Sequence, residues 1–418
     1  MTPKFIQIHF LAAWPGALLN RDDAGLAKRL PFGNVTRTRI SSQCLKRHWR
    51  KADDKHAIVE LASEIGGSPG IRSRSIFSRG VVKPLIDSGY NEDEVQAVTQ
   101  SIYTRIFPAK EGATSKKAPL EMEQAILLGQ PEIDYIKGLV VEVVEGNSEL
   151  KTAIEQKPKT GLTPFQKDFR DNLEQLGKQG KLPHSLEAAL FGRMVTSDVL
   201  SQVNAAIHVA HAFTVHEEQP ELDYFTVVDD LRNREEGDDA GAAGVFDTEL
   251  TSGLYYGYVV VDVPLLVSNL TGCARKDWTG DHDRDLAARV VENLVHLVAE
   301  VSPGAKKGST APYSRAELVL VEAGDRQPRT LANAFRDAVP LTERGSNRSL
   351  GFRTAAAMAG HLSDMDRMYE TGEARRHAAL PDLALAGVEG GSLRELAAWA
   401  GGIVRDAAVA DAPEDVAA

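Results

Sequence analysis

The chain has 418 residues and a formal net charge of −11, and its shares of apolar residues (43%) and charged residues (26%) are ordinary for a soluble globular protein of two or three domains, or of one domain with large insertions. No apolar run is long enough to span a membrane, and the N-terminal segment alternates instead of forming the long apolar core of a signal peptide. Cys44 and Cys273 are the only cysteines, so we expect free thiols and a cytoplasmic location.

The first elements predicted along the chain are a strand, a turn, a second strand and a helix. Residues 5–11 have apolar side chains on both sides of a period-2 pattern, which predicts a strand buried on both faces. A turn at residues 31–34 leads to a strand at residues 35–40, rich in β-branched residues. Ser41 or Ser42 is a suitable cap for a helix that follows directly.

The rest of the chain is predicted to add helices and widely separated strands. Residues 60–190 are mostly helical in pattern, and the segment 216–253 is rich in acidic residues and glycine. Strands are predicted at 253–267 and 315–323, with an amphipathic helix at 284–301 between them. The last fifteen or so residues are expected to fray. Distant strands separated by helices and insertions favour one α+β core.

A basic segment stands out in this acidic chain. From Ala24 to Ala52 there are eight Lys or Arg residues and no Asp or Glu. In a helix that begins near Gln43, the basic residues fall on one face, and two apolar residues four apart can anchor the helix to the core. The basic residues are Lys46, Arg47, Arg50 and Lys51, and the apolar residues are Leu45 and Trp49.

Further cations come from the preceding loop and strand. Arg21 and Lys28 lie in the loop, and Arg37 and Arg39 are two apart on the strand, so they are expected to point the same way. A basic loop, strand and helix face that converge on one groove suit a phosphate backbone. The alternative is a solvated basic face that pairs with acidic residues elsewhere; the absence of interleaved acid favours the groove.

Signals for a metal or cofactor are weak. His208, His211 and His216 have no cysteine nearby, so core or surface histidines are favoured over a zinc site. Asp22 and Asp23 are a vicinal pair of a kind common in turns. The sequence has no P-loop, no nucleophile elbow and no dinucleotide-binding glycine motif. We therefore expect no metal site and no cofactor.

Several segments, in order along the chain, resemble one protein family. They are "LNRDDAG", "RTRISSQCLKRHWR", "GRMVTSD", "AHAFTVH", "YFTVVDDL", "SGLYYGYVVVDVPLLVSNL" and "PGAKK". Together they are similar to the CasC-type backbone subunit of the type I-E Cascade, the CRISPR surveillance complex. The resemblance spans most of the chain and is weakest at residues 55–185 and beyond residue 330. The combination is specific, although no single segment is.

The resemblance implies an α+β fold whose palm is a modified RNA-recognition-motif (ferredoxin-like) fold with a helical finger insertion and a long thumb hairpin. The expected parts are the palm at residues 1–58, 191–215 and 253–400 (with the C-terminal helices), the finger at 59–190, the thumb at 216–252 and a frayed acidic tail at 401–418. The basic loop and helix belong to the first palm segment.

The resemblance also implies roles for single residues. Arg21 lies in the family's "NRDD" loop, and Lys28 lies in the basic segment after it. The segment "SSQ-x-LKR" lines the guide-RNA groove in the family, which adds Ser41, Gln43, Lys46, Arg47 and Arg50 to the expected contacts. Met194 matches an apolar residue that wedges beside a displaced nucleotide, although its alternative role is that of a core methionine. Val35 stands where many relatives carry a basic residue.

The resemblance implies that the chain is a subunit without catalytic activity. Copies of the chain would polymerise along the CRISPR guide RNA, contact other Cascade subunits and present the guide to target DNA in antiviral defence, with no membrane partner. Two alternative functions also fit the sequence. One is a type III-like backbone subunit in which Asp22 or Asp23 supports metal-dependent cleavage of target RNA, and the other is a single-strand RNA-binding regulator outside CRISPR systems.

Overall fold

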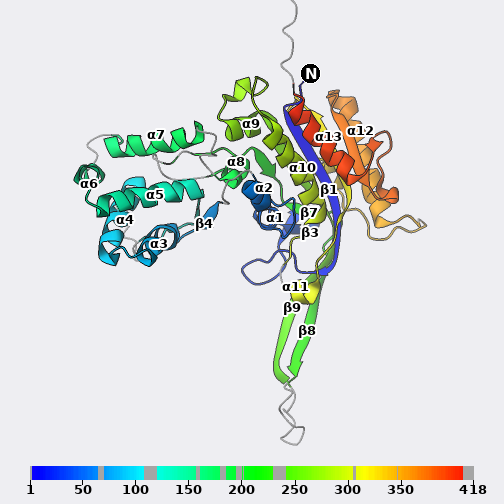
Figure 1. Cartoon of the computed structure of the whole chain (residues 1–418). Helices are drawn as coiled ribbons and strands as arrows, with labels where there is room; N and C mark the ends of the chain where they lie inside the picture. The colour runs from blue at the N-terminus through cyan, green and yellow to red at the C-terminus, as the bar shows by residue number, and fades with distance from the viewer. Residues whose placement is uncertain are drawn as a thin grey trace, which may run out of the picture. The chain divides into compact units, whose positions relative to one another are not determined.

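The computed structural model describes most of the chain as two compact units (Figure 1). The described residues are 2–64, 70–107, 120–156, 161–178, 185–193, 200, 202–228, 242–304, 307–345 and 347–407. Unit 1 comprises Met1–Ala57, Val209–Val261 and Ala288–Ala418, and unit 2 comprises Ile58–His208 and Asp262–Ala287. Within these described ranges no helix is both long and apolar enough to cross a membrane.

Unit 1 is built on a large mixed sheet, which confirms the predicted α+β class. Along the sheet the strands are β12 (Glu389–Gly390), β11 (Ala374–Ala379), β10 (Ala316–Gly324), β1 (Phe5–Ala17), β9 (Ala242–Asp262), β7 (Ala212–Thr214), β3 (Val35–Ile40) and β2 (Arg29–Phe32). The pairs β1–β10 and β10–β11 are antiparallel, whereas β11–β12 is parallel. The unit also contains α1 (Ser42–Arg50), α11 (Lys307–Thr310), α12 (Leu350–Tyr369), α13 (Leu393–Arg405), η3 (Ala332–Phe335) and η4 (Pro381–Leu383).

The first strand is buried on both faces, as its sequence predicts. Ile6, Ile8 and Phe10 alternate with Gln7, His9 and Leu11, and all six are buried. On the Phe10 face the neighbouring strand comes so close that a Cβ atom on Gly257 would lie 2.1 Å from the Phe10 ring. Glycine is therefore required at that position of β9.

The opposite face of the sheet is closed by an apolar cluster. Leu11, Leu254, Tyr256, Leu318 and Leu320 from the strands pack with Leu331, Phe335, Met358 and Leu362 from the 3-10 helix η3, the loop before it and α12. Complete burial of side chains of this size stabilises the fold by about 1.5–3 kcal/mol each. This face of the sheet is therefore part of the core.

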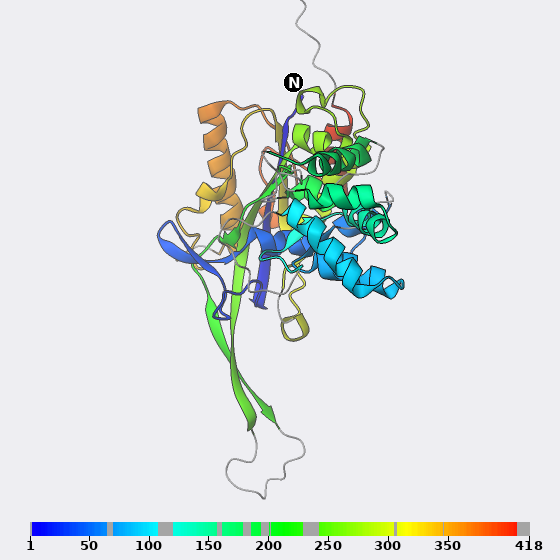
Figure 2. The ribbon, with the colours of Figure 1, turned by 90° about the vertical axis from the view of Figure 1, so that its left-hand side faces the viewer.

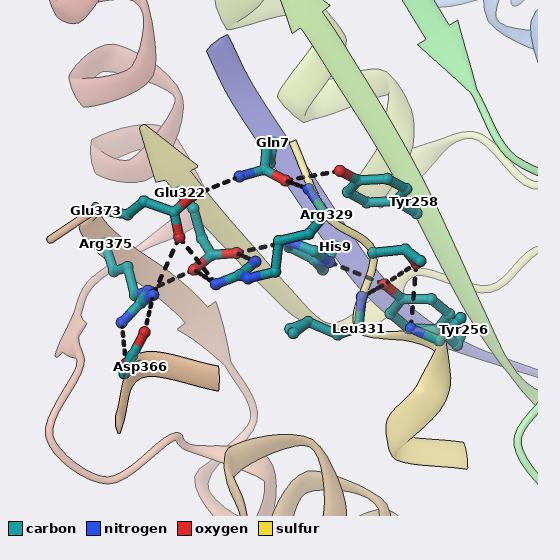
Figure 3. A network of polar contacts seen from close by, with 12 residues as sticks. Gln7, His9, Tyr256, Tyr258, Glu322, Arg329, Leu331, Asp366, Glu373 and Arg375 are labelled. Atoms are coloured by element: carbon teal, nitrogen blue, oxygen red, sulfur yellow. Dashed lines mark hydrogen bonds and ion pairs between the residues drawn. The ribbon is translucent and has the colours of Figure 1, made fainter. Parts of the chain in front are cut away.

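A buried polar network crosses the same face (Figure 3). His9 donates from Nε2 to Glu322 (2.9 Å) and accepts at Nδ1 from the Tyr256 hydroxyl (2.9 Å), so the neutral ring satisfies both partners. Burial lowers the pKa of His9. Burial alone raises the pKa of Glu322, but hydrogen bonds from Arg329 and His9 outweigh it and hold this pKa far below its usual range.

The network extends to strand β11 and helix α12 and ties β9 to β1 a second time. Arg329 also bonds Glu373 (2.8 Å), and Arg375 of β11 bonds Glu322 and Asp366 of α12 (2.5 Å) (Figure 3). Tyr258 of β9 donates to Gln7 of β1 (2.6 Å). Because each buried charge has an opposite partner, the network fixes the register of these elements without leaving an unpaired ion.

A long hairpin projects from the sheet in Figures 1 and 2. It is formed by β8 (Pro220–Val228) and the first part of β9, which pair antiparallel from Pro220↔Thr251 to Val228↔Ala242. The predicted strand at 253–267 is too long, because β9 ends at Asp262. The Asp262 carboxylate accepts from the Leu265 N–H (3.0 Å) and caps α9 (Val263–Thr271).

Unit 2 is mostly helical, which confirms the pattern predicted for residues 60–190. Its helices are α2 (Ile58–Glu64), the π-helix η1 (Ile76–Val82), α3 (Lys83–Asp87), α4 (Glu92–Ile106), α5 (Gln130–Val144), α6 (Ser148–Glu155), α7 (Pro164–Lys178), α8 (Leu186–Phe191), α9 and η2 (Arg275–Asp277). The short strands β4 (Ile71–Ser73) and β5 (Ile126–Leu128) pair antiparallel and were not predicted. Helix α10 (Asp285–Glu300) and strand β6 (Ile207–Val209) continue from one unit into the other.

Candidate nucleic-acid interface

The basic segment folds as a hairpin followed directly by a helix. Strands β2 and β3 pair from Arg29↔Thr38 to Phe32↔Val35, so the turn lies at Gly33 and Asn34, as predicted. Gly33 has a positive φ of 67°, which suits glycine in this turn. Ser41 ends the strand and caps α1, because its hydroxyl accepts from the Cys44 N–H (3.3 Å).

Helix α1 is anchored on one side and basic on the other. Leu45 and Trp49 are 2% and 1% exposed, which confirms their predicted anchoring role. On the other side Gln43, Arg47 and Lys51 are exposed, whereas Lys46 and Arg50 are half-buried. The first turn contains no acidic residue, so the partial positive charge of the helix N-terminus is not offset within the helix.

Polar and charged groups from β3 and α1 meet at His211, just before β7. Its Nδ1 accepts from the Ser42 N–H at the start of α1 (3.2 Å) and lies 3.5 Å from Nη1 of Arg39. Burial lowers the pKa of His211, and the charges of Arg39, Lys28 and Lys46 lower it further. Three cations from a loop, a strand and a helix therefore act on one point.

This convergence is a feature that sequence reasoning missed. The sequence favoured a core or surface role for His211 over a zinc site, but it did not indicate contact with Ser42 and Arg39. His208 contacts the Ala205 carbonyl (3.0 Å), and His216 accepts at Nε2 from the Leu254 N–H (3.1 Å). The segment "AHAFTVH" was the sequence feature that marked this region. The role of His211 in it depends on contacts with residues that are distant in the sequence.

A polar hollow of about 270 Å³ lies beside this point. It is lined by Asp22, Asp23, Ala27, Lys28, Arg29 and Arg39. The Asp22 carboxylate accepts from the N–H groups of Ala24 and Leu26 (both 2.9 Å), which is the geometry of an Asx turn. Among the residues that the structure describes, no cluster of three metal-binding side chains includes Asp22 or Asp23.

Arg37 is not part of the exposed surface, which corrects a prediction. Its side chain is fully buried, and its guanidinium donates to the carbonyls of Phe32 (3.3 Å), Thr214 (3.0 Å) and Phe335 (2.9 Å). Burial lowers its pKa. The prediction that Arg37 and Arg39 point together into a groove is wrong, because Arg37 is used to join β3 to β7 and η3.

Two other members of the basic segment are already engaged. Arg29 forms ion pairs with Glu218 and Glu249 at the base of the long β8–β9 hairpin. Ser41 is 7% exposed, and its hydroxyl is used by the cap. We therefore define the basic surface by the remaining predicted residues, which are exposed or half-buried: Arg21, Lys28, Arg39, Gln43, Lys46, Arg47, Arg50 and Lys51.

Unit 2 holds a buried ion pair that involves Arg193, the residue before the predicted wedge in the sequence. Met194 itself lies outside the described residues. Arg193, which precedes it, is 3% exposed and bonds the Glu132 carboxylate of α5 (2.6 Å). Glu132 also accepts from the Gly129 N–H (2.7 Å) at the start of that helix. Arg193 and Glu132 were not singled out from sequence, because nothing local marks their pairing.

Both cysteines, Cys44 and Cys273, are free, as predicted. Burial raises the pKa of Cys44 to about 11, against the opposing effect of the charges of Arg47 and Lys28. The thiol therefore stays protonated at neutral pH and is a poor ligand and nucleophile. Cys44 serves the packing of α1 beneath the basic surface.

Comparison with known proteins agrees with this arrangement. A family model described as CT1975-like protein matches residues 6–399. A solved structure described as a CRISPR RNA-guided surveillance complex, pre-nicking, contains a chain that is 25% identical, with a TM-score of 0.71 over 95% of this chain and 100% of that chain. A chain of a second structure, described as a CRISPR RNA-guided surveillance complex, is 22% identical and has a TM-score of 0.63 over 94% of this chain and 99% of that chain. It supports the fold. No curated protein sequence matches the chain.

The large mixed sheet, the projecting hairpin and the helical unit define a backbone subunit of a CRISPR surveillance complex. The chain belongs to the family of CT1975-like proteins, the CasC-type backbone subunits of the type I-E Cascade. This family is non-catalytic, in agreement with the function expected from the sequence.

Proposed function

We propose that the basic surface binds the phosphate backbone of CRISPR guide RNA, and that copies of the chain line up along the guide and present it to target DNA. The observation that carries this proposal is geometric: His211 contacts both the Ser42 N–H at the N-terminus of α1 (3.2 Å) and the Arg39 guanidinium (3.5 Å), beside the polar hollow lined by Lys28 and Arg39. Helix N-termini and clustered Lys and Arg are the groups that proteins use for phosphates.

The topology supports a palm of the RNA-recognition-motif type. The central strands lie in the order β10-β1-β9-β7, with α1 between β1 and β7 in sequence and α10 between β9 and β10. A split βαββαβ motif has this order. Unit 1 without the hairpin then corresponds to the palm, the hairpin of β8 and β9 to the thumb, and the helices of unit 2 that lie in residues 59–190 to the finger.

The sheet itself is a poor surface for RNA. RNA-recognition motifs stack bases on aromatic side chains of an open sheet face. Here Tyr256 and Tyr258 lie on the face that α12 and η3 close, and their hydroxyls are bonded within the core (Figure 3). We therefore place the guide on the basic surface instead. Because Lys and Arg contact phosphates without reading bases, binding should show no sequence preference.

Two of the acidic residues of the β8–β9 hairpin segment have basic partners within the chain. Residues 216–252 contain twelve Asp and Glu residues, and two of them, Glu218 and Glu249, pair with Arg29. This pairing ties the base of the hairpin to β2. We propose that other acidic residues of the hairpin contact the basic surface of the next copy, since opposite charges steer and orient such contacts.

Met194 keeps its proposed role as a wedge beside a displaced nucleotide. The residue before it is held in place: the Arg193 N–H donates to the Val203 carbonyl (2.9 Å), and the Arg193 side chain bonds Glu132. An unbranched thioether suits contact with a base. Met194→Ala should then blur any periodic tolerance of guide–target mismatches without a large loss of stability.

Co-expression with a CRISPR array tests the proposal. The wild-type chain should retain short RNA of uniform length, and Lys46→Glu with Arg47→Glu should lose it while remaining folded. The matched control is Arg367→Glu with Arg394→Glu, which reverses two exposed cations on α12 and α13 and should retain the RNA.

Each alternative predicts a different outcome. A mixed RNA population would favour a regulator outside CRISPR systems. Magnesium-dependent cleavage of complementary RNA, lost in Asp22→Asn or Asp23→Asn, would favour the type III-like function. The hydrogen bonds from Ala24 and Leu26 both go to Oδ1 of Asp22 and hold this side chain in its turn.

A further inference from the structure

A histidine–carboxylate cluster in unit 1 lies apart from the basic surface. His56 belongs to the segment after α1, and His296 and Glu300 are four residues apart on α10, so both face the same side of that helix. We propose that His56, His296 and Glu300 form a binding site for a divalent transition metal of the zinc type. This inference goes beyond the proposed RNA function and does not depend on it.

The donor atoms have the right chemistry and nearly the right spacing. Two imidazole nitrogens and one carboxylate oxygen form a donor set that zinc uses when it keeps an open position. Bond lengths of about 2.0–2.1 Å in a tetrahedral site place donor atoms about 3.4 Å apart. His296 Nδ1 lies 3.3 Å from Glu300 Oε2, and His56 Nδ1 lies 3.9 Å from the same oxygen. All three donor atoms lie within 4.8 Å of one another.

The imidazole rings must tilt to share one ion. They are stacked with centroids 4.0 Å apart and an angle of 4° between their planes. Nitrogen lone pairs lie in the ring plane, so parallel rings direct them along parallel lines. For both nitrogens to bind one ion, the rings must rotate about their χ2 angles until the lone pairs meet, and the His56–Glu300 separation of 3.9 Å must shorten by about 0.5 Å. Metal binding should therefore break the stack.

The surroundings supply access and further oxygen. The side chains of His56, His296 and Glu300 are 16%, 17% and 23% exposed, so an ion can enter from solvent. The Asp54 carboxylate accepts from the backbone N–H of His56 (2.8 Å) and lies 3.1 Å from its Nδ1. Because this Nδ1 would bind the ion, it would no longer donate to Asp54, and the Asp54 carboxylate would be placed to supply a fourth ligand. Arg315 lies 3.7 Å from Glu300, but its side chain is 80% exposed and free to swing away.

The site would join two elements that flank the basic helix. His48 of α1 already accepts at Nε2 from the Gly304 N–H (3.3 Å), just after α10. A metal held by His56 and two residues of α10 would add a second tie beyond the C-terminal end of α1. The expected consequence is a stiffer attachment of α1 to α10.

Cobalt titration tests the site directly. The full chain, without a histidine tag and after treatment with a chelator, should bind one equivalent of Co²⁺ with the intense visible absorption of tetrahedral coordination. Equimolar Zn²⁺ should displace the Co²⁺, and Zn²⁺ alone should raise the melting temperature. His56→Ala and His296→Ala should abolish the band. Glu300→Gln, which preserves shape, should weaken binding about tenfold or more.

Controls make the outcome decisive. His361→Ala removes a partly exposed helical histidine on α12 and should leave the titration unchanged. Far-ultraviolet circular dichroism of each variant establishes that it is folded before it is titrated. The proposal is overturned if the wild-type chain gives only the weak absorption of octahedral Co²⁺, or if folded Glu300→Gln binds as tightly as wild type. RNA retention is measured separately, so loss of the metal site does not count against the RNA function.

Discussion

Arg37 and Arg39 lie two residues apart on β3, and replacing each by methionine should have opposite consequences. Arg37 is fully buried and donates to three backbone carbonyls, from Phe32, Thr214 and Phe335. Arg39 is half-buried at the basic surface, where it donates to the Arg29 carbonyl (3.1 Å). Arg37→Met should destabilise the fold, whereas Arg39→Met should weaken RNA binding.

The size of the first effect follows from these hydrogen bonds. Methionine retains much of the aliphatic packing but leaves three carbonyls without their donor. Each unsatisfied buried group costs about 1–3 kcal/mol, and removing the buried guanidinium recovers part of that cost because its desolvation is no longer required. We therefore expect the free energy of unfolding to fall by about 2–4 kcal/mol in Arg37→Met.

Urea unfolding and RNA binding of the same two variants provide the assay. Arg39→Met should change the free energy of unfolding by less than about 1 kcal/mol, because it loses one partly exposed hydrogen bond. Folded Arg37→Met should bind RNA within about twofold of wild type, since a buried guanidinium contacts no phosphate. Unchanged stability of Arg37→Met together with lost RNA binding would refute this reasoning.

Three further predictions concern other parts of unit 1. Gly257→Ala places a Cβ atom 2.1 Å from the Phe10 ring and should cost about 1–3 kcal/mol or more of stability, measured by urea unfolding; a neutral effect would show that the strands can separate. Burial lowers the pKa values of His9, His216 and His377 below the ordinary 6.5, so on acidification the unfolded chain takes up protons that the folded chain does not. Stability should therefore fall from pH 7 to pH 5, by up to about 1.4 kcal/mol per pH unit for each histidine, and a flat profile in thermal unfolding would contradict this assignment. Because its pKa is about 11, Cys44 should react with iodoacetamide at pH 8 only in unfolded chains, as followed by mass spectrometry; rapid labelling of the native protein would show an exposed thiolate.

Local patterns predicted the elements that carry the basic surface. The alternation of β1, the turn at Gly33, a cap at Ser41 or Ser42 (Ser41 in the structure) and the anchoring of α1 by Leu45 and Trp49 all depend on residues close in sequence. The prediction of a strand over residues 253–267 was too long for a different reason. An apolar run does not distinguish strand from helix, although Asp262 followed by Pro264 was a readable helix start.

Contacts between distant residues account for what sequence reasoning missed. The buried Arg37 guanidinium bonds the carbonyls of Thr214 and Phe335, which are 177 and 298 residues away in the sequence. The inward direction of this side chain could therefore not be predicted from the strand pattern. The contact of His211 with the Ser42 N–H of α1 likewise joins residues that are 169 apart in the sequence. The pairing of His56 with His296 likewise depends on how α10 packs beside the segment after α1.

The salt dependence of RNA binding tests the central claim most directly. Arg47 and Lys51 are exposed and four residues apart on the basic face of α1. For single-stranded RNA, each phosphate contact contributes about 0.7 to the slope of log K against log salt concentration. We predict that Arg47→Ala with Lys51→Ala reduces this slope by about 1.4, whereas the matched double variant Arg367→Ala with Arg394→Ala leaves it unchanged. Equal slopes for the wild type and both double variants would contradict the proposal that α1 holds the guide.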